Sequence, residues 1–533
     1  MKPRLILHGA ENRRRLLIGA QIFARTVCVT YGPHGRIVLL DRSAGLLATK
    51  DGVTVAREID LKDRVADMAC QAFKSACIKV NDEAGDGTTT TACVAAAILK
   101  EGCKIVEGGY NPIHVAQGIQ MASQAAVDAV LDIARPIESQ EQLEKVALIA
   151  SNDDAEIAAN MAEAVMAVGK NGTVSIEDGN GVETVLDFKE GMEINRGVAS
   201  GHFLKKSTER VFDGPLVACI AATLSSTEDV LDICEVATTL GGRPLVIFCE
   251  GINGEALKTL ILNDSNVDIN FEFAAILAPG NFEWKAKHLG DIAALAGADL
   301  IDPKAAGQWT EWDPSWFGAL RTIKAEAKKS TLIAYDEASE VIRDRIQLIK
   351  AERMHATSQY DTDRINERIA CLEGGLCIMQ IGAHTEAELK EKRARVEDAL
   401  GAVQGALEEG IVPGGGTIYL AAYQAIQGMC PSEDDRDIIA GWGIMERALL
   451  RPMTVLVDNA GKNGEYMVDK LLDLRGDEWD SWLGWDGRAN EFRDFGIDGT
   501  VIDPTRVAIA VIEAAASAAS TLMTAEASIT DEP

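Results

Sequence analysis

The spacing of apolar residues changes character twice along the chain. It first follows helical periodicity, which predicts helices over residues 12–30, 66–80, 88–107 and 112–134, with one short strand over 37–40. Short apolar runs bounded by turn residues then predict strands over 173–176, 182–188, 217–221, 245–248 and 273–277. Helices over 228–240 and 254–263 alternate with these strands. Helical periodicity returns over 386–409, 438–459 and 507–527.

This order predicts a multi-domain α+β protein in which an α/β domain is inserted between two helical halves. The length of 533 residues suits two to four domains. Gly191 and the pair Gly374-Gly375 lie at the two crossings between helical and α/β sequence. They suit hinges because glycine tolerates large changes in φ and ψ. Ordinary loop glycines are an equally weighted alternative.

Composition excludes several classes of protein. The net charge of −30 would repel a phosphate backbone, so no nucleic-acid partner is expected. The eleven cysteines include no Cys-x-x-Cys pair, which excludes zinc spacing and predicts mostly buried thiols in a reducing cytoplasm. No apolar run approaches the length of a membrane span, so no membrane partner is expected. The basic residues 1–15 lack the apolar stretch of a signal peptide. No presequence is expected either, because residues 9–36 already indicate a helix that leads into a motif.

The segment Asp86-Gly87-Thr88-Thr89-Thr90-Thr91 precedes a predicted helix and is the most informative motif. Free N–H groups and the dipole at a helix N-terminus favour an anion, and hydroxyl groups can add donors to phosphate oxygens. Asp86 suits a Mg²⁺ ligand. A plain Asp/Thr helix cap explains the segment slightly better when it is taken alone.

Three further turns carry groups that are useful around a nucleotide: Thr30-Tyr31-Gly32-Pro33, Lys50-Asp51-Gly52 and Gly414-Gly415-Gly416. Each is weak evidence by itself. The chain has no P-loop sequence and no kinase signature set, which excludes those two classes of ATP-using enzyme.

Many collinear segments together resemble the group I chaperonins, the GroEL type, over nearly the whole chain. They are residues 30–36, 50–53, 81–90, 190–192, 254–257, 278–280, 395–400, 408–410, 414–416 and 502–504. The resemblance implies an equatorial ATPase domain from residues 1–132 and 409–533. It implies an intermediate domain from residues 133–190 and 376–408, and an apical client-binding domain from residues 191–375.

The resemblance also assigns an ATP site with Mg²⁺, with K⁺ as a further candidate ion. Asp86 matches the metal ligand, and Asp51 and Asp398 match the catalytic carboxylates around the attacking water. The nucleotide-binding residues would be Thr30, Tyr31, Gly32, Pro33, Lys50, Asp86, Gly87, Thr88, Thr89, Thr90, Gly415, Asp486 and Asp503. Since Asp398 would lie on the intermediate domain, hydrolysis would wait for that domain to swing onto the pocket.

The resemblance implies that non-native proteins bind an apolar apical groove. Its residues would be Val198, His202, Phe203, Leu231, Cys234, Leu257, Ile261 and Leu262, and a helix face packed into the core is the alternative. Arg196 and Glu386 match a salt bridge between subunits, with two independent surface charges as the alternative. A homo-oligomeric ring, expected to be sevenfold, follows from the resemblance. A lid co-chaperonin is a further candidate partner.

The sequence departs from the family pattern mainly in the apical region. Val198 and His202 replace tyrosines and Cys234 replaces a leucine, which predicts a less aromatic groove. Trp309, Trp312 and Trp316 are an apical addition for which a core role is the leading interpretation. The sequence therefore predicts an ATP-dependent folding chaperone. The alternative is a chaperonin-like assembly ring with narrowed or no general folding activity.

Overall fold

The computed structural model describes residues 4–42, 45–151, 153–169, 172–179, 181–189, 191–265, 271–281, 283–302, 312–335, 339–354, 358–373, 375–431 and 434–531. The chain forms two compact units, one from Met1–Glu163 with Lys390–Pro533 and one from Ala164–Leu389. The chain passes from one unit to the other within α7 (Ala155–Val168) and α14 (Glu386–Glu409). This is the inserted arrangement predicted from the sequence, whereas a separate intermediate domain stays a prediction.

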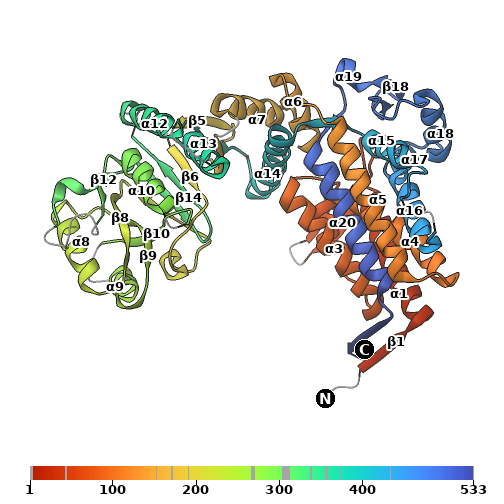
Figure 1. Cartoon of the computed structure of the whole chain (residues 1–533), viewed down its shortest axis with the longest axis horizontal. Coiled ribbons are helices and arrows are strands. Elements are labelled where there is room, and N and C mark those ends of the chain that lie inside the picture. The colour runs from red at the N-terminus through yellow and green to blue at the C-terminus, as the bar shows by residue number, and fades with distance from the viewer. Residues whose placement is uncertain are drawn as a thin grey trace. The chain divides into compact units, whose positions relative to one another are not determined.

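The first unit is built on long helices that lie side by side (Figure 1). They are α1 (Gly9–Cys28), α3 (Arg64–Ala84), α4 (Thr88–Glu107), α5 (Pro112–Ile133), α16 (Arg436–Leu449) and α20 (Thr505–Thr524). Their inner faces are rich in alanine and valine, and glycines allow the closest crossings. A Cβ at Gly19 would lie 1.9 Å from the carbonyl oxygen of Ala66, and one at Gly118 would lie 2.1 Å from that of Ile438. Small residues thus set the spacing of the bundle.

Shorter helices of the same unit cover one end of the bundle. They are α2 (Gly52–Glu58), α6 (Gln140–Ala150), α15 (Thr417–Ile426), α17 (Arg451–Asn459), α18 (Gly464–Arg475) and α19 (Phe495–Asp498). The single helix predicted over 438–459 is wrong, because α16 ends before Leu450 and α17 starts there. Pro452 lies in the first turn of α17, where its missing N–H is tolerated.

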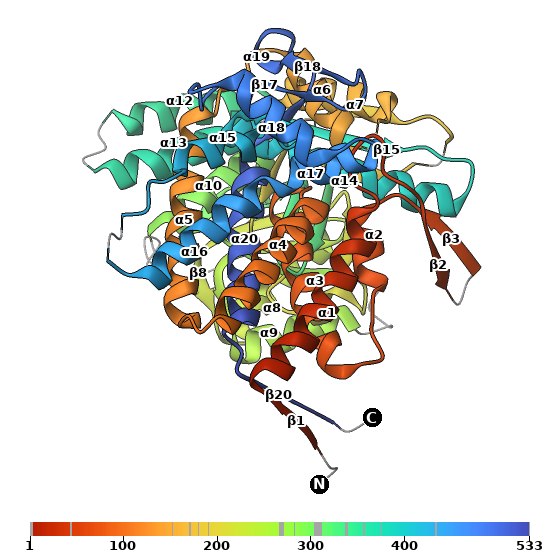
Figure 2. The same cartoon turned by 90° about the vertical axis from the view of Figure 1, so that its right-hand side faces the viewer.

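Four two-stranded ladders complete the first unit. They pair β1 (Arg4–His8) with β20 (Ala527–Asp531), β2 (Val38–Arg42) with β3 (Gly45–Thr49), β16 (Ile411–Pro413) with β19 (Ile502–Pro504), and β17 (Leu483–Asp486) with β18 (Glu491–Asp494). The β1–β20 and β2–β3 ribbons extend away from the helices (Figure 2). Neither ribbon was predicted as a ladder, since the sequence indicated only a strand near residues 37–40.

The second unit contains a mainly parallel sheet in the order β10-β9-β8-β11, with β12 (Gly318–Ala319) antiparallel to β8. The strands are β8 (Leu216–Leu224), β9 (Leu245–Ile252), β10 (Phe273–Leu277) and β11 (Leu300–Ile301). The helices α8 (Glu228–Thr239), α9 (Gly254–Ser265) and α10 (Glu283–Ala296) connect successive strands of this sheet. Because such crossovers are right-handed as a rule, this strand order puts α8 and α9 on one face and α10 on the other. The α/β character predicted for this region is confirmed.

Two smaller sheets flank it, in the orders β6-β14-β13-β7 and β4-β15-β5. Their strands are β4 (Thr173–Asp178), β5 (Val185–Lys189), β6 (Gly191–Ile194), β7 (Glu209–Asp213), β13 (Thr322–Glu326), β14 (Ser330–Ile333) and β15 (Leu376–Ile381). The helices α12 (Ser339–Arg353) and α13 (Gln359–Glu373) pack together and are tied to α10 by a buried ion pair. In it, Arg368 Nε lies 2.7 Å from Asp291 Oδ2.

Two predictions from composition can be compared with this fold. All eleven cysteines are free thiols and most are buried, as expected. The sequence also predicted that no apolar run is as long as a membrane span. This prediction is wrong for α20, which is long and apolar enough by length and composition alone. About half of its apolar stretch (56%) is buried, and it packs against α3, α4 and α5, as a core helix of the bundle does.

Candidate nucleotide site and apical surface

The motif at residues 86–91 forms the start of α4. Gly87 has a φ of +99°, which disfavours other residues. A Cβ there would also lie 2.9 Å from Val511 Cγ2 and 3.0 Å from Val80 Cγ1. Because no side chain caps the helix, its first N–H groups stay available to an anion.

The threonine hydroxyls after Gly87 do not all serve the same purpose. Those of Thr88 and Thr91 donate within the protein, to the carbonyl oxygens of Cys77 and Gly87. Thr88 was predicted to bind nucleotide, yet it is buried, so its contribution would be its backbone N–H. Thr90 donates to the Tyr31 hydroxyl at 3.2 Å. Thr89 therefore supplies the one hydroxyl of the four with no bond among the described residues.

The turn at residues 30–36 lies against this motif. Arg36 N donates to the carbonyl oxygen of Val29 at 2.8 Å and closes the turn. A Cβ at Gly35 would lie 1.9 Å from the carbonyl oxygen of Thr30, so the closure requires glycine. Asn459 Nδ2 donates to the carbonyl oxygens of Cys28 and Tyr31, both at 3.0 Å. Sequence reasoning missed Asn459, which no motif marked.

The segment Lys50-Asp51-Gly52 joins the turn to α4. Lys50 Nζ donates to the carbonyl oxygen of Pro33 at 3.2 Å. Asp51 caps α2 by accepting from Val53 N at 3.3 Å and Thr54 N at 2.7 Å. A Cβ at Gly52 would lie 2.3 Å from Thr89 Oγ1 and 3.7 Å from Thr30 Oγ1. The three predicted segments are therefore brought together.

Asp398 on α14 reaches the same place from far along the chain. Its Oδ1 accepts a hydrogen bond from Asn81 Nδ2 at 3.4 Å. The αL residue Gly85 packs so closely on α14 that a Cβ there would lie 2.8 Å from the carbonyl oxygen of Asp398. In this structure α14 is thus seated on the loop that carries Asp86. Asn81 was within a quoted motif but had not been given a role.

Asp503 comes from the β16–β19 ladder, where it is paired with Val412. A Cβ at Gly414 would lie 2.8 Å from its Oδ1, so the glycine stretch gives the carboxylate its room. Gly415 has a φ of +61°, and its N–H donates to Asp503. Gly415 and Asp503, each predicted to bind nucleotide, therefore lie together.

Four carboxylates, those of Asp51, Asp86, Asp398 and Asp503, interact electrostatically here. Burial and the charges of Asp51 and Asp86 raise the pKa of Asp398 to about 7. Burial and the charge of Asp86 raise the pKa of Asp503 to about 7, although the Gly415 N–H opposes the shift. Burial and the charge of Asp51 also raise the pKa of Asp86. Within the described part of the chain none of the four forms an ion pair. The donor set consequently fits a hard cation such as Mg²⁺.

Comparison with known proteins bears on the family and the fold. Residues 23–533 match the model of the TCP-1/cpn60 chaperonin family. The chain belongs to that family. Two crystal structures of the chaperonin gp146 from bacteriophage EL 2 (Pseudomonas aeruginosa), obtained in the presence of ATP-BeFx, have the same fold. Crystal form II gives a TM-score of 0.75 at 20% identity over 99% of this chain and 100% of that one. Crystal form I gives 0.68 at 21% identity over 99% of each.

Asp486 is committed to a structural role in this chaperonin. Its Oδ1 accepts from Arg488 N at 2.8 Å and Ala489 N at 3.1 Å, and its Oδ2 lies 3.7 Å from Arg493 Nη1. These bonds hold the β17–β18 turn. The turn still borders the predicted pocket, because the carbonyl oxygen of Gly487 lies 2.9 Å from His34 Nε2. Asp486 thus shapes the turn, and its carboxylate is already occupied.

The apical residues predicted to bind clients divide by exposure. Val198, Phe203 and Cys234 are buried in the apical core, which argues against contact with a client in this arrangement. Leu231 and Leu262 are exposed, at 39% and 69%, and Leu257 and Ile261 are partly exposed on α9. His202 is also exposed. Cys234 lies on the inward face of α8, Phe203 lies in the turn Gly201–Leu204, and Val198 forms a bridge with Ile276.

Among the predicted hinge and switch residues, Gly191 has a local structural explanation. A Cβ at Gly191 would lie 2.4 Å from the carbonyl oxygen of Leu332, so close strand packing explains this glycine. Gly375 accepts from Thr173 N through its carbonyl oxygen at 3.0 Å, and Gly374 lies outside the described residues. Arg196 and Glu386 are exposed and have no ion pair among the described residues. Their hinge and switch roles stay predictions.

The apical tryptophans are partly in the core, as expected. Trp312 is buried and packs edge-on against Trp316 with ring centroids 5.6 Å apart. It also contacts Phe317 at 5.7 Å. Trp309 lies outside the described residues.

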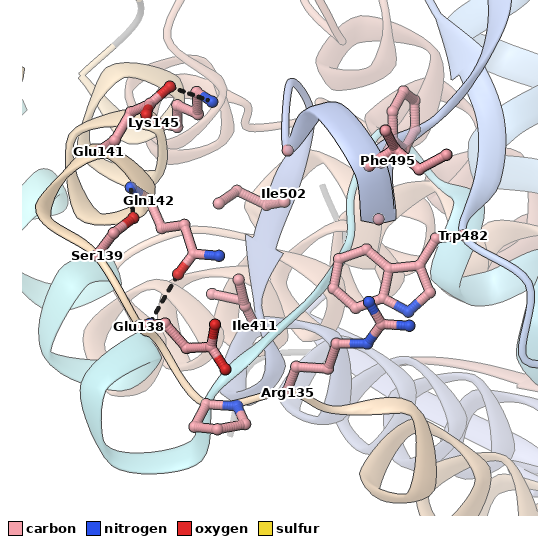
Figure 3. Close-up of a pocket in the computed structure, with 14 residues that line it drawn as sticks. Arg135, Glu138, Ser139, Glu141, Gln142, Lys145, Ile411, Trp482, Phe495 and Ile502 are labelled. Atoms are coloured by element: carbon pink, nitrogen blue, oxygen red, sulfur yellow. Dashed lines mark hydrogen bonds and ion pairs between the residues drawn. The ribbon is translucent and has the colours of Figure 1, made fainter.

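A cavity of about 380 Å³ lies beside the β16–β19 ladder (Figure 3). Arg135 lies over the Trp482 ring at 4.4 Å on one side of it, and Glu138 and Gln142 lie on the other. Ile502 lines the cavity. Because neighbouring residues of a strand face opposite sides, Asp503 faces away from it. No residue predicted to bind nucleotide is among the described residues that line this cavity, which is therefore separate from the carboxylate cluster.

Proposed function

We propose that this chaperonin is an ATP-driven folding chaperone of the group I type that hydrolyses ATP at the four-carboxylate site. The observation that carries the proposal is the convergence of Asp51, Asp86, Asp398 and Asp503 on the uncapped start of α4. Carboxylates gathered at one site without basic partners repel one another, so a bound cation would relieve their repulsion and could hold a phosphate group beside them.

Each residue has a role that its position supports. Asp86 would hold Mg²⁺, which when bound would neutralise charge on the phosphate oxygens. The N–H groups after Gly87 and the Thr89 hydroxyl would bind phosphate oxygens. Asp51 and Asp398 would orient the attacking water and accept its proton. A K⁺ ion and a cytoplasmic location stay predictions.

The position of Asp398 would couple hydrolysis to conformation. Asp398 stands on α14, a helix that begins with residues of the second unit. Its approach to the pocket depends on the packing of α14 against Gly85. A change in that packing would move Asp398 away from the pocket and stop hydrolysis. ATP hydrolysis would therefore depend on the position of α14.

A ring of subunits is supported by the two exposed β-ribbons. The β2–β3 ribbon carries Leu39 and Leu46 on one face, at 63% and 71% exposure. The β1–β20 ribbon has Ile6 and Ile529 exposed at 50% and 55%. Each ribbon has unpaired edges, which favour pairing with another strand. A contact between different ribbons of neighbouring subunits would be heterologous and would form a ring where the rotation closes; sevenfold symmetry stays a prediction.

The test of the ATPase assignment is a comparison of Asp398→Ala with Glu397→Ala. Glu397 is the exposed neighbour of Asp398 on α14 and pairs with Arg393 at 2.9 Å. We expect Asp398→Ala to lower ATP turnover by at least about 100-fold with nucleotide binding retained, because a positioned base contributes that much. Glu397→Ala should turn over normally. Equal turnover in both variants would contradict the assignment of Asp398.

Refolding of a denatured client in the same experiment separates the two candidate functions. A folding chaperone should lose ATP-dependent refolding in Asp398→Ala and keep it in Glu397→Ala. An assembly ring with no general folding activity would form rings, and its Glu397→Ala variant would hydrolyse ATP, yet neither variant would refold the client. The burial of Val198, Phe203 and Cys234 is the observation that keeps this alternative open.

A further inference from the structure

The helix α8 carries a stripe of acidic side chains on its outer face. Glu228, Asp232 and Glu235 occur at positions i, i+4 and i+7 and are all exposed. This spacing places them on one side of the helix. The helix contains no lysine or arginine, and none of the three carboxylates has an ion pair among the described residues. Like charges three or four residues apart destabilise a helix, so a basic partner would relieve this repulsion.

The acidic stripe runs beside the exposed apolar residues of the groove. The two helices are joined by Thr227 Oγ1 and Thr259 Oγ1, 3.4 Å apart. Helical spacing from Thr227 places Leu231 on the side of α8 nearest α9, and Leu262 follows Thr259 on α9. The acids lie next to Leu231 on the outer side of α8. A segment bound between the two helices would therefore contact Leu231 and Leu262, and its side nearest the outer face of α8 would contact the carboxylates.

Other charges nearby do not cancel the stripe. On the exposed face of α9, Glu255 and Lys258 balance each other. Asp229 is engaged by the N–H groups of Ser225 and Ser226, at 2.8 and 2.9 Å. Lys205, on the turn beside α9, is paired with Asp264 at 3.6 Å. Asp264 is also bound by Arg210, and Lys206 is exposed next to Lys205, so the turn beside α9 carries some positive charge. The exposed face of α8 itself carries only negative charge.

We propose that this groove selects client segments in which apolar residues are flanked by lysine or arginine. The apolar residues would cover Leu231 and Leu262, and the basic ones would pair with the stripe formed by Glu228, Asp232 and Glu235. This inference rests on the proposed chaperone function and names its preferred client chemistry. Two surface ion pairs of ordinary strength would give about a five-fold preference.

The experiment uses the full-length protein without nucleotide and three labelled peptides of one apolar sequence. The flanking residues are lysine in the first peptide, glutamine in the second and glutamate in the third. Fluorescence anisotropy gives each dissociation constant at low salt and at 0.3 M salt. We expect the lysine peptide to bind about five-fold more tightly than the glutamine peptide, and the difference to shrink at high salt because exposed charges are screened.

The variant Asp232→Asn with Glu235→Gln removes two charges without changing side-chain size. It should bring the lysine and glutamine peptides to similar affinities while leaving the glutamine peptide unchanged. The matched control is Asp344→Asn with Asp213→Asn, two exposed acids that lie outside α8 and α9. This control should keep the preference for lysine.

The outcomes separate this inference from the proposed function. Equal binding of all three peptides, or tighter binding of the glutamate peptide, would overturn the inference and leave the chaperone function standing. No binding of any peptide would overturn the client-binding function and the inference with it. A preference that survives in the Asp232/Glu235 variant would also overturn the inference, because the charge would then act elsewhere.

Discussion

The nucleotide pocket and the apical groove differ in how tightly the fold constrains their residues. In the pocket, a positive φ at Gly87 and the close contacts that a Cβ would make at Gly35 and Gly52 leave almost no choice of side chain at these positions. In the groove, Leu231 and Leu262 stand on the exposed faces of regular helices, where many residues fit. A site for one fixed ligand is therefore built from constrained loops, whereas a site for varied polypeptides is built from interchangeable helix positions.

Gly87→Ala tests how tightly the fold constrains the pocket, and we expect it to have the largest effect on stability and ATP affinity. An alanine would adopt a disfavoured φ and press against Val80 and Val511, which should cost about 2–5 kcal/mol of unfolding free energy. The displaced loop should also lower ATP affinity by roughly 100-fold or more, since its N–H groups would no longer converge. Thermal or chemical denaturation and calorimetric titration of ATP measure the two effects.

Gly109→Ala is the matched control. Gly109 also has a positive φ, of +90°, but a Cβ there would meet nothing within 4 Å. We expect only the conformational cost of about 1–2 kcal/mol and unchanged ATP affinity. Equal effects of the two substitutions on ATP affinity would show that the close contacts at Gly87 do not shape the pocket.

A smaller effect is expected from the charges that the pocket concentrates. The folded-state pKa of Asp398, about 7, lies above its ordinary value of 3.8. The folded protein therefore retains a proton that the unfolded chain releases between these two values, and stability falls as the pH rises from about 4 to about 7. Asp398→Asn removes this loss because asparagine does not titrate. In nucleotide-free protein with EDTA, the substitution should raise the unfolding free energy by about 2 kcal/mol at pH 8 and change it little at pH 4.5.

Denaturant titrations of the wild type and of Asp398→Asn at the two pH values measure this difference. Subtracting the unfolding free energy of the wild type at each pH removes the contribution of the other acids, which both proteins share. A stabilisation of equal size at pH 4.5 and pH 8 would mean that the raised pKa of Asp398, which burial and the neighbouring carboxylates cause, is not its origin. Glu397→Gln on the same helix should show neither effect, because its side chain is half exposed and paired with Arg393.

The same contrast explains which parts of the fold could be predicted from sequence. Helices with strong periodicity and marked ends, such as α4 and α14, lie where the sequence predicted them. The β1–β20 ladder could not be predicted, because it pairs His8 with Ala527 and neither short segment carries a signal for the other. The break between α16 and α17 was missed because the apolar spacing continues through Leu450 and Pro452.

The candidate site divides in a similar way. Taken alone, the residues around Asp86 predicted little more than a helix cap. The resemblance to chaperonins was needed to associate this segment with Asp398. The supporting amides of Asn81 and Asn459 were missed because their partners are a distant carboxylate and two backbone carbonyls. Burial of Phe203 and Cys234 was also missed, since a short apolar segment does not show which of its sides faces the sheet.

The smallest effect concerns the interchangeable groove positions and compares Leu262→Ser with Leu260→Ser. Leu262 is 69% exposed, so its replacement should change the unfolding free energy by less than about 0.5 kcal/mol. Since a client would cover this side chain, capture of a denatured protein should weaken roughly three- to ten-fold. Leu260 is fully buried, and Leu260→Ser should instead destabilise the apical unit by about 2–5 kcal/mol. Unchanged capture by a folded Leu262→Ser protein would place the client surface away from α9. The comparison would then still describe the constrained nucleotide pocket, but α9 would no longer represent the client-binding site.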